Sequence, residues 1–317
     1  MIYGDKMRLE LARLRADFTF NVRSFFREKG YTDVETPILS PFLLPEPALE
    51  VFETCFEHPF GFRSVPGEDT LAADKLRTPG HEGKTPFYLI PSPELWMKRL
   101  VAEGFGDIFQ ITRCFRNGEA VGREHNPEFT MCEWYSVGRD YIYSMDLTEE
   151  LFSFLLSRIP PPGDALERLS PPFTRVSMRD AFDRFAGLDL DDLLRHPGKE
   201  EKAEELGIRL SPVWTCEEFF NKLFLDKVEP ALADLGAVIL YDFPACVPTL
   251  AREKSDGLYA ERWELYCAGS EIANCYGEET DPERVEAFIR KESERKKEAL
   301  VPHRIDTVFS SLYKMEH

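Results

Sequence analysis

The chain lacks any long uninterrupted apolar run, any Cys-x-x-Cys pair and any cluster of histidines. No apolar stretch approaches the roughly 20 residues of a membrane helix, and the N-terminus has no signal-peptide pattern, so we expect no membrane attachment. The seven cysteines are scattered, which predicts reduced thiols and a cytoplasmic protein. The six histidines form no ligand group, which argues against zinc.

Basic residues are also scarce relative to acidic ones. The chain has 39 Lys and Arg against 57 Asp and Glu, a net charge of −18. Contacts to phosphates need clustered basic side chains, so this balance disfavours a general nucleic-acid binder, although it leaves room for a local basic patch. The remaining composition, 43% apolar and 30% charged over 317 residues, is that of a soluble globular protein with one large domain or two.

The most informative stretch is FQITRCFRNGEAVGREHNPEFTMCEWY, residues 109–135. Strict alternation on both sides of a polar loop predicts two strands joined as a hairpin. The first strand puts four side chains on one face, Gln110, Thr112, Cys114 and Arg116. The second alternates in the same way through Phe129, Met131, Glu133 and Tyr135. Arg116 at the end of the first strand could offer a planar, permanently charged fork to a phosphate.

Two segments near the N-terminus predict a helix followed by short strands. Apolar residues recur at helical spacing through Leu11, Leu14, Phe18, Val22 and Phe25, in a helix expected to end at Gly30. The following GYTDVETPILSP is short and β-like, broken by prolines. Residues 59–86 are polar, rich in Gly and Pro and without periodicity, which predicts a surface insertion loop.

After that loop, YLIPSPELWMKRLVAEG predicts a strand that enters a helix. Ser92 is the expected N-cap, with Pro93 at the first helical position. Glu94 would be a first-turn carboxylate that complements the helix dipole, which is a common structural placement.

The middle of the chain, residues 159–230, is expected to be a largely helical insertion that follows a Pro-rich break at 159–172. Thr215 and Glu218 form a capping-box pattern. A stripe at helical spacing then predicts core packing, with no functional role, through Phe219, Phe220, Leu223, Phe224 and Val228. AVILYDFP, from Ala237, predicts a buried strand.

A second chemical pattern is ERWELYCAGSEIANCYGEE, residues 261–279. It predicts a hairpin that turns near Ala268–Gly269 and brings Glu264 and Glu271 to one face. Facing carboxylates repel unless a cation lies between them, and Mg²⁺ with substrate phosphates suits such a pair. The alternative is two solvated glutamates on an exposed hairpin.

The hairpin at 109–135 resembles motif 2 of class II aminoacyl-tRNA synthetases, and its FRN and HNPEFTMCEWY pieces resemble the lysyl branch. The N-terminal helix and strand resemble motif 1, which in that family builds a homodimer interface. The resemblance runs over nearly the whole chain. It implies an α+β fold: a single class II catalytic domain over 1–317, with an antiparallel sheet flanked by helices.

The resemblance also implies ATP as a substrate and Mg²⁺ as its metal. Arg116 and Glu264 would be the catalytic residues, and Glu264 and Glu271 would hold the metal. The implied ATP site comprises Arg116, Asn117, Gly118, Glu119, Asn126, Glu264 and Leu265. The implied amino-acid pocket comprises Ser92, Pro93, Glu94, Tyr135, Glu271, Asn274 and Glu278.

Lysyl-tRNA synthetases carry an N-terminal anticodon-binding barrel, for which residues before the motif 1 pattern leave no room. The chain is therefore similar to the elongation factor P lysine ligases, which implies (R)-β-lysine or lysine as substrate and elongation factor P as acceptor, rather than tRNA. A lysyl-tRNA-charging core and a non-catalytic paralogue are the alternatives.

The chain departs from the family pattern at three places. Gly118 lengthens the motif 2 loop, Cys275 stands where the family has glycine, and the sequence stops at SSLYKMEH before a recognisable motif 3. In the family, motif 3 carries an arginine for ATP, so its absence predicts a large loss of activity and an exposed sheet edge.

Overall fold

The computed structural model describes residues 5–57, 84–118, 121–122, 125–195, 215–303, 305–306 and 309–314. The chain divides into two compact units, each described by itself. Unit 1 comprises Met1–Lys29 and Gly138–Val285, and unit 2 comprises Gly30–Val137 and Glu286–His317. The predicted insertion loop at 59–86 lies outside the described residues as far as 83, and its last part is not loop, because strand β4 begins at Lys84.

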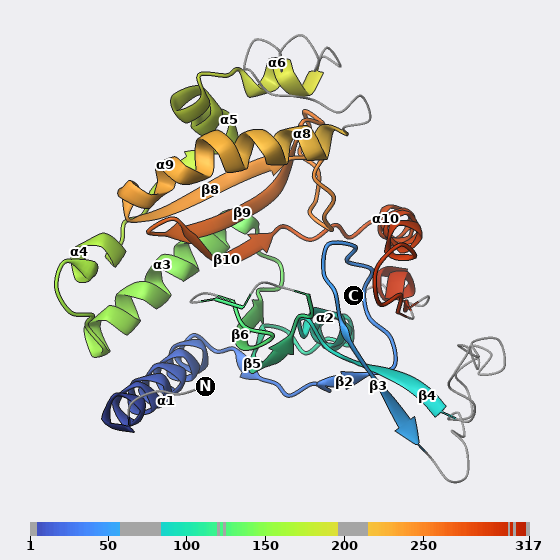
Figure 1. The fold of residues 1–317 in the computed structure, drawn as a ribbon, viewed down its shortest axis with the longest axis horizontal. Helices are drawn as coiled ribbons and strands as arrows, with labels where there is room; N and C mark the ends of the chain where they lie inside the picture. The colour runs from blue at the N-terminus through green and yellow to red at the C-terminus, as the bar shows by residue number, and fades with distance from the viewer. Residues whose placement is uncertain are drawn as a thin grey trace. The chain divides into compact units, whose positions relative to one another are not determined.

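Unit 1 is built on a four-stranded sheet in the order β10-β9-β8-β7. Figure 1 labels β8, β9 and β10 of this sheet. The strands are β7 (Thr174–Ser177), β8 (Ala237–Pro244), β9 (Tyr259–Cys267) and β10 (Ser270–Tyr276). β7 runs parallel to β8, and the other neighbours are antiparallel. The predicted hairpin is confirmed as β9–β10, and its turn residues Ala268 and Gly269 both have positive φ, the twist that suits a two-residue hairpin loop.

The two faces of this sheet carry separate cores, because side chains alternate along β8. Val238 and Leu240 pack under the helices that precede β8, whereas Ala237 and Ile239 pack against α3 (Tyr141–Arg158). In Figure 1, α8 and α9 lie along one side of the sheet and α3 along the other. Between α3 and β8 the described helical elements are α4 (Ala165–Leu169), α5 (Met178–Ala181), η1 (Phe182–Ala186), α6 (Leu190–Arg195), α8 (Cys216–Leu223), η2 (Phe224–Val228), α9 (Glu229–Leu232) and η3 (Ala233–Leu235).

The described part of the 159–230 segment is largely helical and also contains β7, which joins the sheet. The capping box is confirmed at α8, where the Glu218 amide donates to Thr215 Oγ1 at 3.2 Å and the Thr215 amide donates to the Glu218 carboxylate at 2.7 Å. The predicted apolar stripe also lies in the core, as Phe219, Phe220, Leu223, Phe224 and Val228 are all buried.

Helix α1 (Asp5–Glu28) packs on α3 within unit 1. Phe25 is buried, and its ring meets that of Phe154 edge-on, with centroids 5.4 Å apart. The predicted amphipathic stripe is only partly buried, because Leu11, Leu14 and Phe18 are each 48–49% exposed. α1 stops before Gly30, whose φ of 88° is the left-handed conformation that ends helices.

Unit 2 holds two three-stranded sheets, ordered β1-β5-β6 and β2-β4-β3. The first comprises β1 (Thr32–Asp33), β5 (Ile108–Phe115) and β6 (Glu128–Tyr135). The second comprises β2 (Leu39–Ser40), β3 (Phe52–Glu57) and β4 (Lys84–Leu89). Its helical elements are α2 (Glu94–Ala102) and η4 (Phe309–Lys314), together with the end of α10 (Pro282–Lys296), which begins in unit 1.

The start of α2 corrects one prediction. The N-cap is Pro93, not Ser92, and the helix makes no side-chain cap hydrogen bond there. Pro93 already has helical backbone angles, and its carbonyl accepts from the amides of Trp96 and Met97 at 3.1 and 3.0 Å. The proline ring fixes φ near the helical value. The helix therefore begins at Glu94, one residue later than a Ser92 cap would require.

Candidate active site

The residues predicted to act together fall into one group in each unit. In unit 2, the predicted hairpin is confirmed as β5–β6, paired from Ile108 opposite Tyr135 to Phe115 opposite Glu128. Directly opposed residues share a face of an antiparallel pair, so the two alternating sets predicted for the strands lie on the same face. Arg116 ends that face, and its guanidinium lies 5.2 Å from the centre of the Phe129 ring.

The backbone after β5 is held in place by its neighbours. The Arg116 amide donates to the Pro127 carbonyl at 3.0 Å, and the Asn117 amide donates to the Glu50 carbonyl at 2.9 Å. Gly118 has a φ of 75°, which glycine adopts readily and other residues rarely do. A glycine at position 118 therefore suits the backbone conformation of the loop. Glu119, predicted for the ATP site, lies outside the described residues, and Asn126 is exposed.

The start of α2 carries the predicted Ser92, Pro93 and Glu94. Glu94 is not a simple dipole carboxylate, because its Oε1 accepts from Lys98 Nζ at 2.7 Å with both side chains well covered, 17% and 5% exposed. At such a covered position each charge depends on the other, because loss of one partner would leave an uncompensated buried charge.

Glu133 is a residue that sequence reasoning did not select. It lies opposite Gln110 on the Arg116 face, and its Oε1 accepts from the Tyr135 hydroxyl at 2.8 Å. Burial, with a smaller effect of Glu133, raises the pKa of the Cys114 thiol to about 12. The alternation of Glu133 with Tyr135 along the strand is the sequence signal that could have identified Glu133.

In unit 1, Glu264 is the most constrained of the predicted residues. Its side chain is 6% exposed, and its two oxygens accept from Arg262 Nη2 at 2.5 Å and from the Tyr266 hydroxyl at 2.6 Å. Burial first, and then the negative charges of Glu264 and Glu271, raise the pKa of Tyr266. Tyr266 therefore remains a neutral donor to Glu264.

Glu264 and Glu271 lie on the same face of the hairpin, in a diagonal position and not directly opposite each other. Glu271 is opposite Tyr266, while Asn274 is opposite Glu264, because the register shifts between Glu271 and Ala273. Asn274 Nδ2 donates to the Glu271 carboxylate at 3.3 Å. Leu265 points the other way, since its fully buried side chain belongs to the core against α3.

Glu278 follows β10, where the chain is tied to a neighbouring segment. The Arg252 amide donates to the Gly277 carbonyl at 2.7 Å, and Arg252 Nη2 donates to the Glu278 carbonyl at 3.1 Å. Gly277 also lies close to Glu261: its amide donates to the Glu261 carbonyl at 2.7 Å, and a Cβ at position 277 would clash with the Glu261 side chain. Cys275, predicted to stand where the family has glycine, contacts Ser144 through its Sγ, which lies 3.1 Å from Ser144 Oγ.

A further carboxylate, Glu229 of α9, was also missed by the sequence reasoning. Burial, and then the nearby charge of Glu264, raise its pKa. Within the described ranges no group of three or more His, Cys, Asp or Glu side chains could hold a metal by itself. Glu264 and Glu271 instead present oxygen donors on one face, and this matches Mg²⁺, which takes one or two carboxylates together with substrate phosphates.

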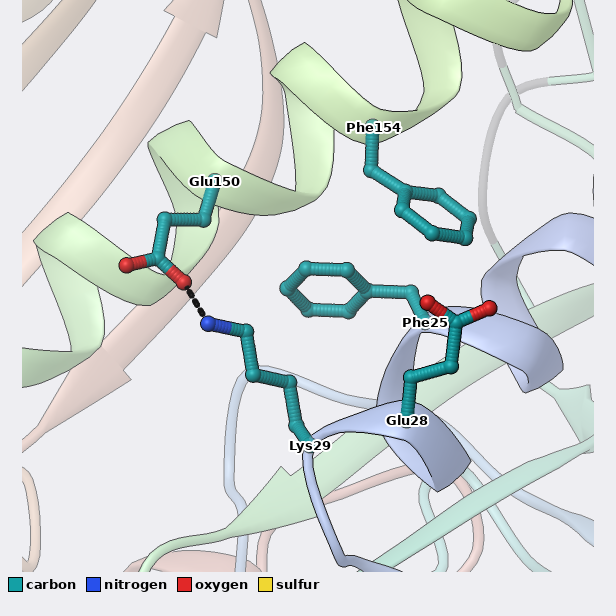
Figure 2. A pocket seen from close by; sticks show the side chains of 5 residues that line it. All are labelled: Phe25, Glu28, Lys29, Glu150 and Phe154. Carbon is teal, nitrogen blue, oxygen red and sulfur yellow. Dashed lines mark hydrogen bonds and ion pairs between the residues drawn. The ribbon is translucent and has the colours of Figure 1, made fainter.

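A shallow hollow between α1 and α3 lies apart from the predicted residues of unit 1. It is lined by Phe25, Glu28, Lys29, Glu150 and Phe154 (Figure 2). An ion pair between Lys29 and Glu150 spans it. None of the predicted site residues lines this hollow, so we assign it no part in the site.

With the two groups described, comparison with known proteins defines the class. Residues 4–304 match the family of class II tRNA synthetases of the D, K and N type. The chain belongs to this family, and the predicted α+β catalytic fold with mixed helices and antiparallel sheets is confirmed. Among the helices that the structure describes, none combines the length and apolar character that a membrane crossing requires.

Curated relatives identify the lysyl branch. The chain is 36% identical over 289 residues to an elongation factor P--(R)-beta-lysine ligase of Photorhabdus laumondii, covering 89% of this chain and 77% of that protein. It is 33% identical over 300 residues to the Mannheimia succiniciproducens ligase of the same name, covering 92% and 80%. It is 34% identical over 284 residues to a lysine--tRNA ligase of Dehalococcoides mccartyi, covering 87% of this chain and about half (51%) of that protein's length.

Proposed function

We propose that this protein activates (R)-β-lysine or lysine with ATP and transfers it to a lysine side chain of elongation factor P. Support for this proposal comes from the similarity to ligases named for that reaction and from the residues that the lysyl-type motifs place on shared faces. The observation that carries the chemistry is Arg116 at the end of β5, on the face that also bears Glu133 and Tyr135.

In the first step, a carboxylate oxygen of the amino acid attacks the α-phosphorus of ATP. A new P–O bond forms, the bond to the β-phosphate breaks, and pyrophosphate leaves. Arg116 stabilises the charge that develops on the α-phosphate, because a rigid fork of donors fits a phosphate. Asn126 helps to place ATP, with the backbone at Asn117 and Gly118 beside it.

The amino-acid pocket would use Ser92, Glu94, Tyr135 and Glu278. Glu278 takes the distal amine of the substrate, and a half-buried carboxylate there discriminates against substrates that lack the amine, since they would leave it unpaired. Glu271 and Asn274 would also contribute to binding the amino acid.

Glu264 and Glu271 would hold Mg²⁺ with the ATP phosphates. When bound, the ion neutralises phosphate charge. Arg262 and Tyr266 position Glu264 by donating to its two oxygens, so its orientation is set before the substrate arrives.

In the second step, the ε-amine of the acceptor lysine attacks the carbonyl carbon of the adenylate. An amide bond forms, AMP leaves with the electron pair of the broken C–O bond, and the amine loses a proton. Catalysis in both steps depends on positioning and electrostatics, without covalent attachment to the enzyme.

The second candidate is charging of tRNA, which the lysine--tRNA ligase relatives favour. The net charge of −18 argues against it, because gripping tRNA needs clustered basic side chains. The test is amino-acid-dependent ATP–pyrophosphate exchange with (R)-β-lysine and with L-lysine, followed by transfer to purified elongation factor P or to lysine tRNA. Exchange with transfer only to the protein supports the proposal. Transfer only to tRNA establishes the alternative, and absence of exchange in the folded chain rejects both.

A further inference from the structure

The segment Glu46–Val51 of unit 2 runs directly beside the start of the motif 2 loop. The Glu50 carbonyl accepts from the Asn117 amide at 2.9 Å, and the Val51 carbonyl accepts from Asn117 Nδ2 at 3.4 Å. These two bonds fix the segment against the residue that follows Arg116.

A buried lysine holds the other end of the segment. Lys296 is 2% exposed, and its Nζ donates to the carbonyls of Glu46, at 3.2 Å, and of Leu49. The Leu49 amide in turn donates to the Glu46 carbonyl at 3.1 Å, closing a turn. The backbone of Glu46 is thus held by hydrogen bonds to its carbonyl, and these bonds do not involve its side chain.

The Glu46 carboxyl lies among charges of both signs. It is half-buried, and no described residue donates a hydrogen bond or ion pair to it, whereas Glu94 is paired with Lys98. Burial and the nearby Glu94 raise the pKa of Glu46 to about 7, while Arg116, Lys296 and Lys98 oppose the rise. A carboxyl in this state gains from the arrival of one more cation.

The chemistry of an amino acid supplies that cation at this place. Its ammonium group is on the α or β carbon, immediately next to the carboxyl group that reacts. If Arg116 holds the reacting carboxyl or the phosphate joined to it, the ammonium must lie within a short distance of Arg116. Glu46 meets this requirement, because the charge of Arg116 is near enough to lower its pKa and Lys296 holds its backbone in place.

We propose that Glu46 is a specificity-determining residue whose carboxylate accepts the α- or β-ammonium group of the amino-acid substrate beside Arg116. This inference rests on the proposed function, since it requires that the site take an amino acid. The role differs from the one proposed for Glu278, because Glu46 would bind the ammonium next to the reacting carboxyl and Glu278 the distal amine.

The test compares Glu46→Gln with wild type in ATP–pyrophosphate exchange. The substrates are L-lysine and (R)-β-lysine, and ε-aminocaproate, which has the distal amine but no α or β amine, serves as an inhibitor. We expect Glu46→Gln to raise KM for both substrates about tenfold with a smaller change in kcat, because a charge-assisted hydrogen bond is lost. The inhibition constant of ε-aminocaproate should stay within about twofold, since it makes no contact with Glu46. Glu103→Gln, at the exposed C-terminal end of α2, is the matched control and should change neither value.

Two further measurements separate recognition from a structural effect. Glu46→Asp, which keeps the charge, should recover part of the lost affinity. In wild type, KM for L-lysine should fall as the pH rises from about 6 to about 8, since the carboxyl ionises near 7, and this dependence should flatten in Glu46→Gln. The groups that face Glu46 are Glu94 and Lys98 of α2, Arg116 after β5 and Lys296 of α10.

Equal losses for lysine and ε-aminocaproate would overturn the inference, because they would show a damaged pocket and not a missing contact. Unchanged KM in Glu46→Gln would overturn it as well, with the proposed function left standing. If wild type itself shows no exchange and no lysine binding by calorimetry, the proposed function fails and this inference falls with it.

Discussion

Asn274 lies directly opposite Glu264 across the β9–β10 hairpin, where a regular two-residue hairpin would put Ala273. The extra residue between Glu271 and Ala273 moves Asn274 onto the carboxylate face. A bulge in this place re-aims a polar side chain, and Glu264, Glu271 and Asn274 consequently share one surface.

Replacing Glu264 should damage the chemistry more than the fold. Glu264→Gln keeps the shape but cannot accept from Arg262 and Tyr266 at once, so we expect exchange to fall by about 10²-fold, as for other lost preorganised groups. Glu253→Gln, 54% exposed in the same unit, is the control. A loss of less than about threefold in Glu264→Gln would contradict its assignment.

Arg116 should carry most of the transition-state stabilisation assigned to unit 2. Arg116→Ala should reduce kcat for exchange by about 10²–10³-fold, the usual cost of removing a donor aimed at developing charge. Arg113→Ala is a sharp control, because Arg113 lies on the same strand, is 49% exposed and pairs only loosely with Glu128 at 3.4 Å. Equal losses in the two variants would mean that the strand has been disturbed.

The raised pKa of Glu46 should make stability depend on pH. Its pKa is about 7 when folded and near its ordinary 4.5 when unfolded, so the folded state holds the proton more tightly. This contribution is present in full below about 4.5 and is lost as the pH rises through 7. Glu46→Gln should therefore melt higher than wild type at about pH 8, with a difference that shrinks towards about pH 5. A difference that is the same at both pH values would remove the case for a buried, titrating Glu46, and Glu103→Gln gives the baseline.

The Glu94–Lys98 pair tests how strongly the start of α2 depends on paired charge. Lys98→Ala leaves a mostly buried carboxylate without its partner, and we expect a loss of about 3 kcal/mol in the free energy of unfolding. Lys222→Ala breaks an exposed pair of the same spacing with Asp226, whose cost should be below about 0.5 kcal/mol. Urea denaturation measures both, and similar losses would show that the first pair is not effectively buried.

The exposed part of α1 predicts self-association. Leu11, Leu14 and Phe18 are each 48–49% exposed, and the resemblance to motif 1 suggests a second copy as their partner. Phe18→Asp should shift the protein from dimer to monomer in analytical ultracentrifugation, whereas Leu225→Asp, at a 55% exposed position of η2, should not. A wild-type monomer at all concentrations would refute this prediction.

Local pattern was enough to predict much of the fold. Both hairpins, the capping box of Thr215 and the buried strand at Ala237 follow from alternation, spacing and cap chemistry, which act between near neighbours. The N-cap of α2 was wrong because Ser92 and Pro93 both fit the start of a helix, and the proline angles decided between them. The exposure of Leu14 and Phe18 could not be foreseen, since a periodic stripe does not say what covers it.

The site was predicted less completely, because its missing members depend on long-range contacts. Glu133 owes its place on the Arg116 face to the strand register and accepts from the Tyr135 hydroxyl. Glu229 stands out because burial and the nearby charge of Glu264 raise its pKa. Glu46 is a still clearer case, as its surroundings come from α2, the end of β5 and α10. No local pattern in PEPALE indicates such a neighbourhood.

The lysine that fixes the Glu46 backbone is about 250 positions further along the chain. Glu50 has the same long reach, since its carboxylate accepts from the amides of Leu300 and Val301 at 3.0 and 3.2 Å. During synthesis the β5–β6 hairpin can form early, but the segment beside it must wait until α10 has left the ribosome. A ribosome-bound chain stopped before Lys296 should therefore hold a folded hairpin without an ordered Glu46–Val51 segment beside it.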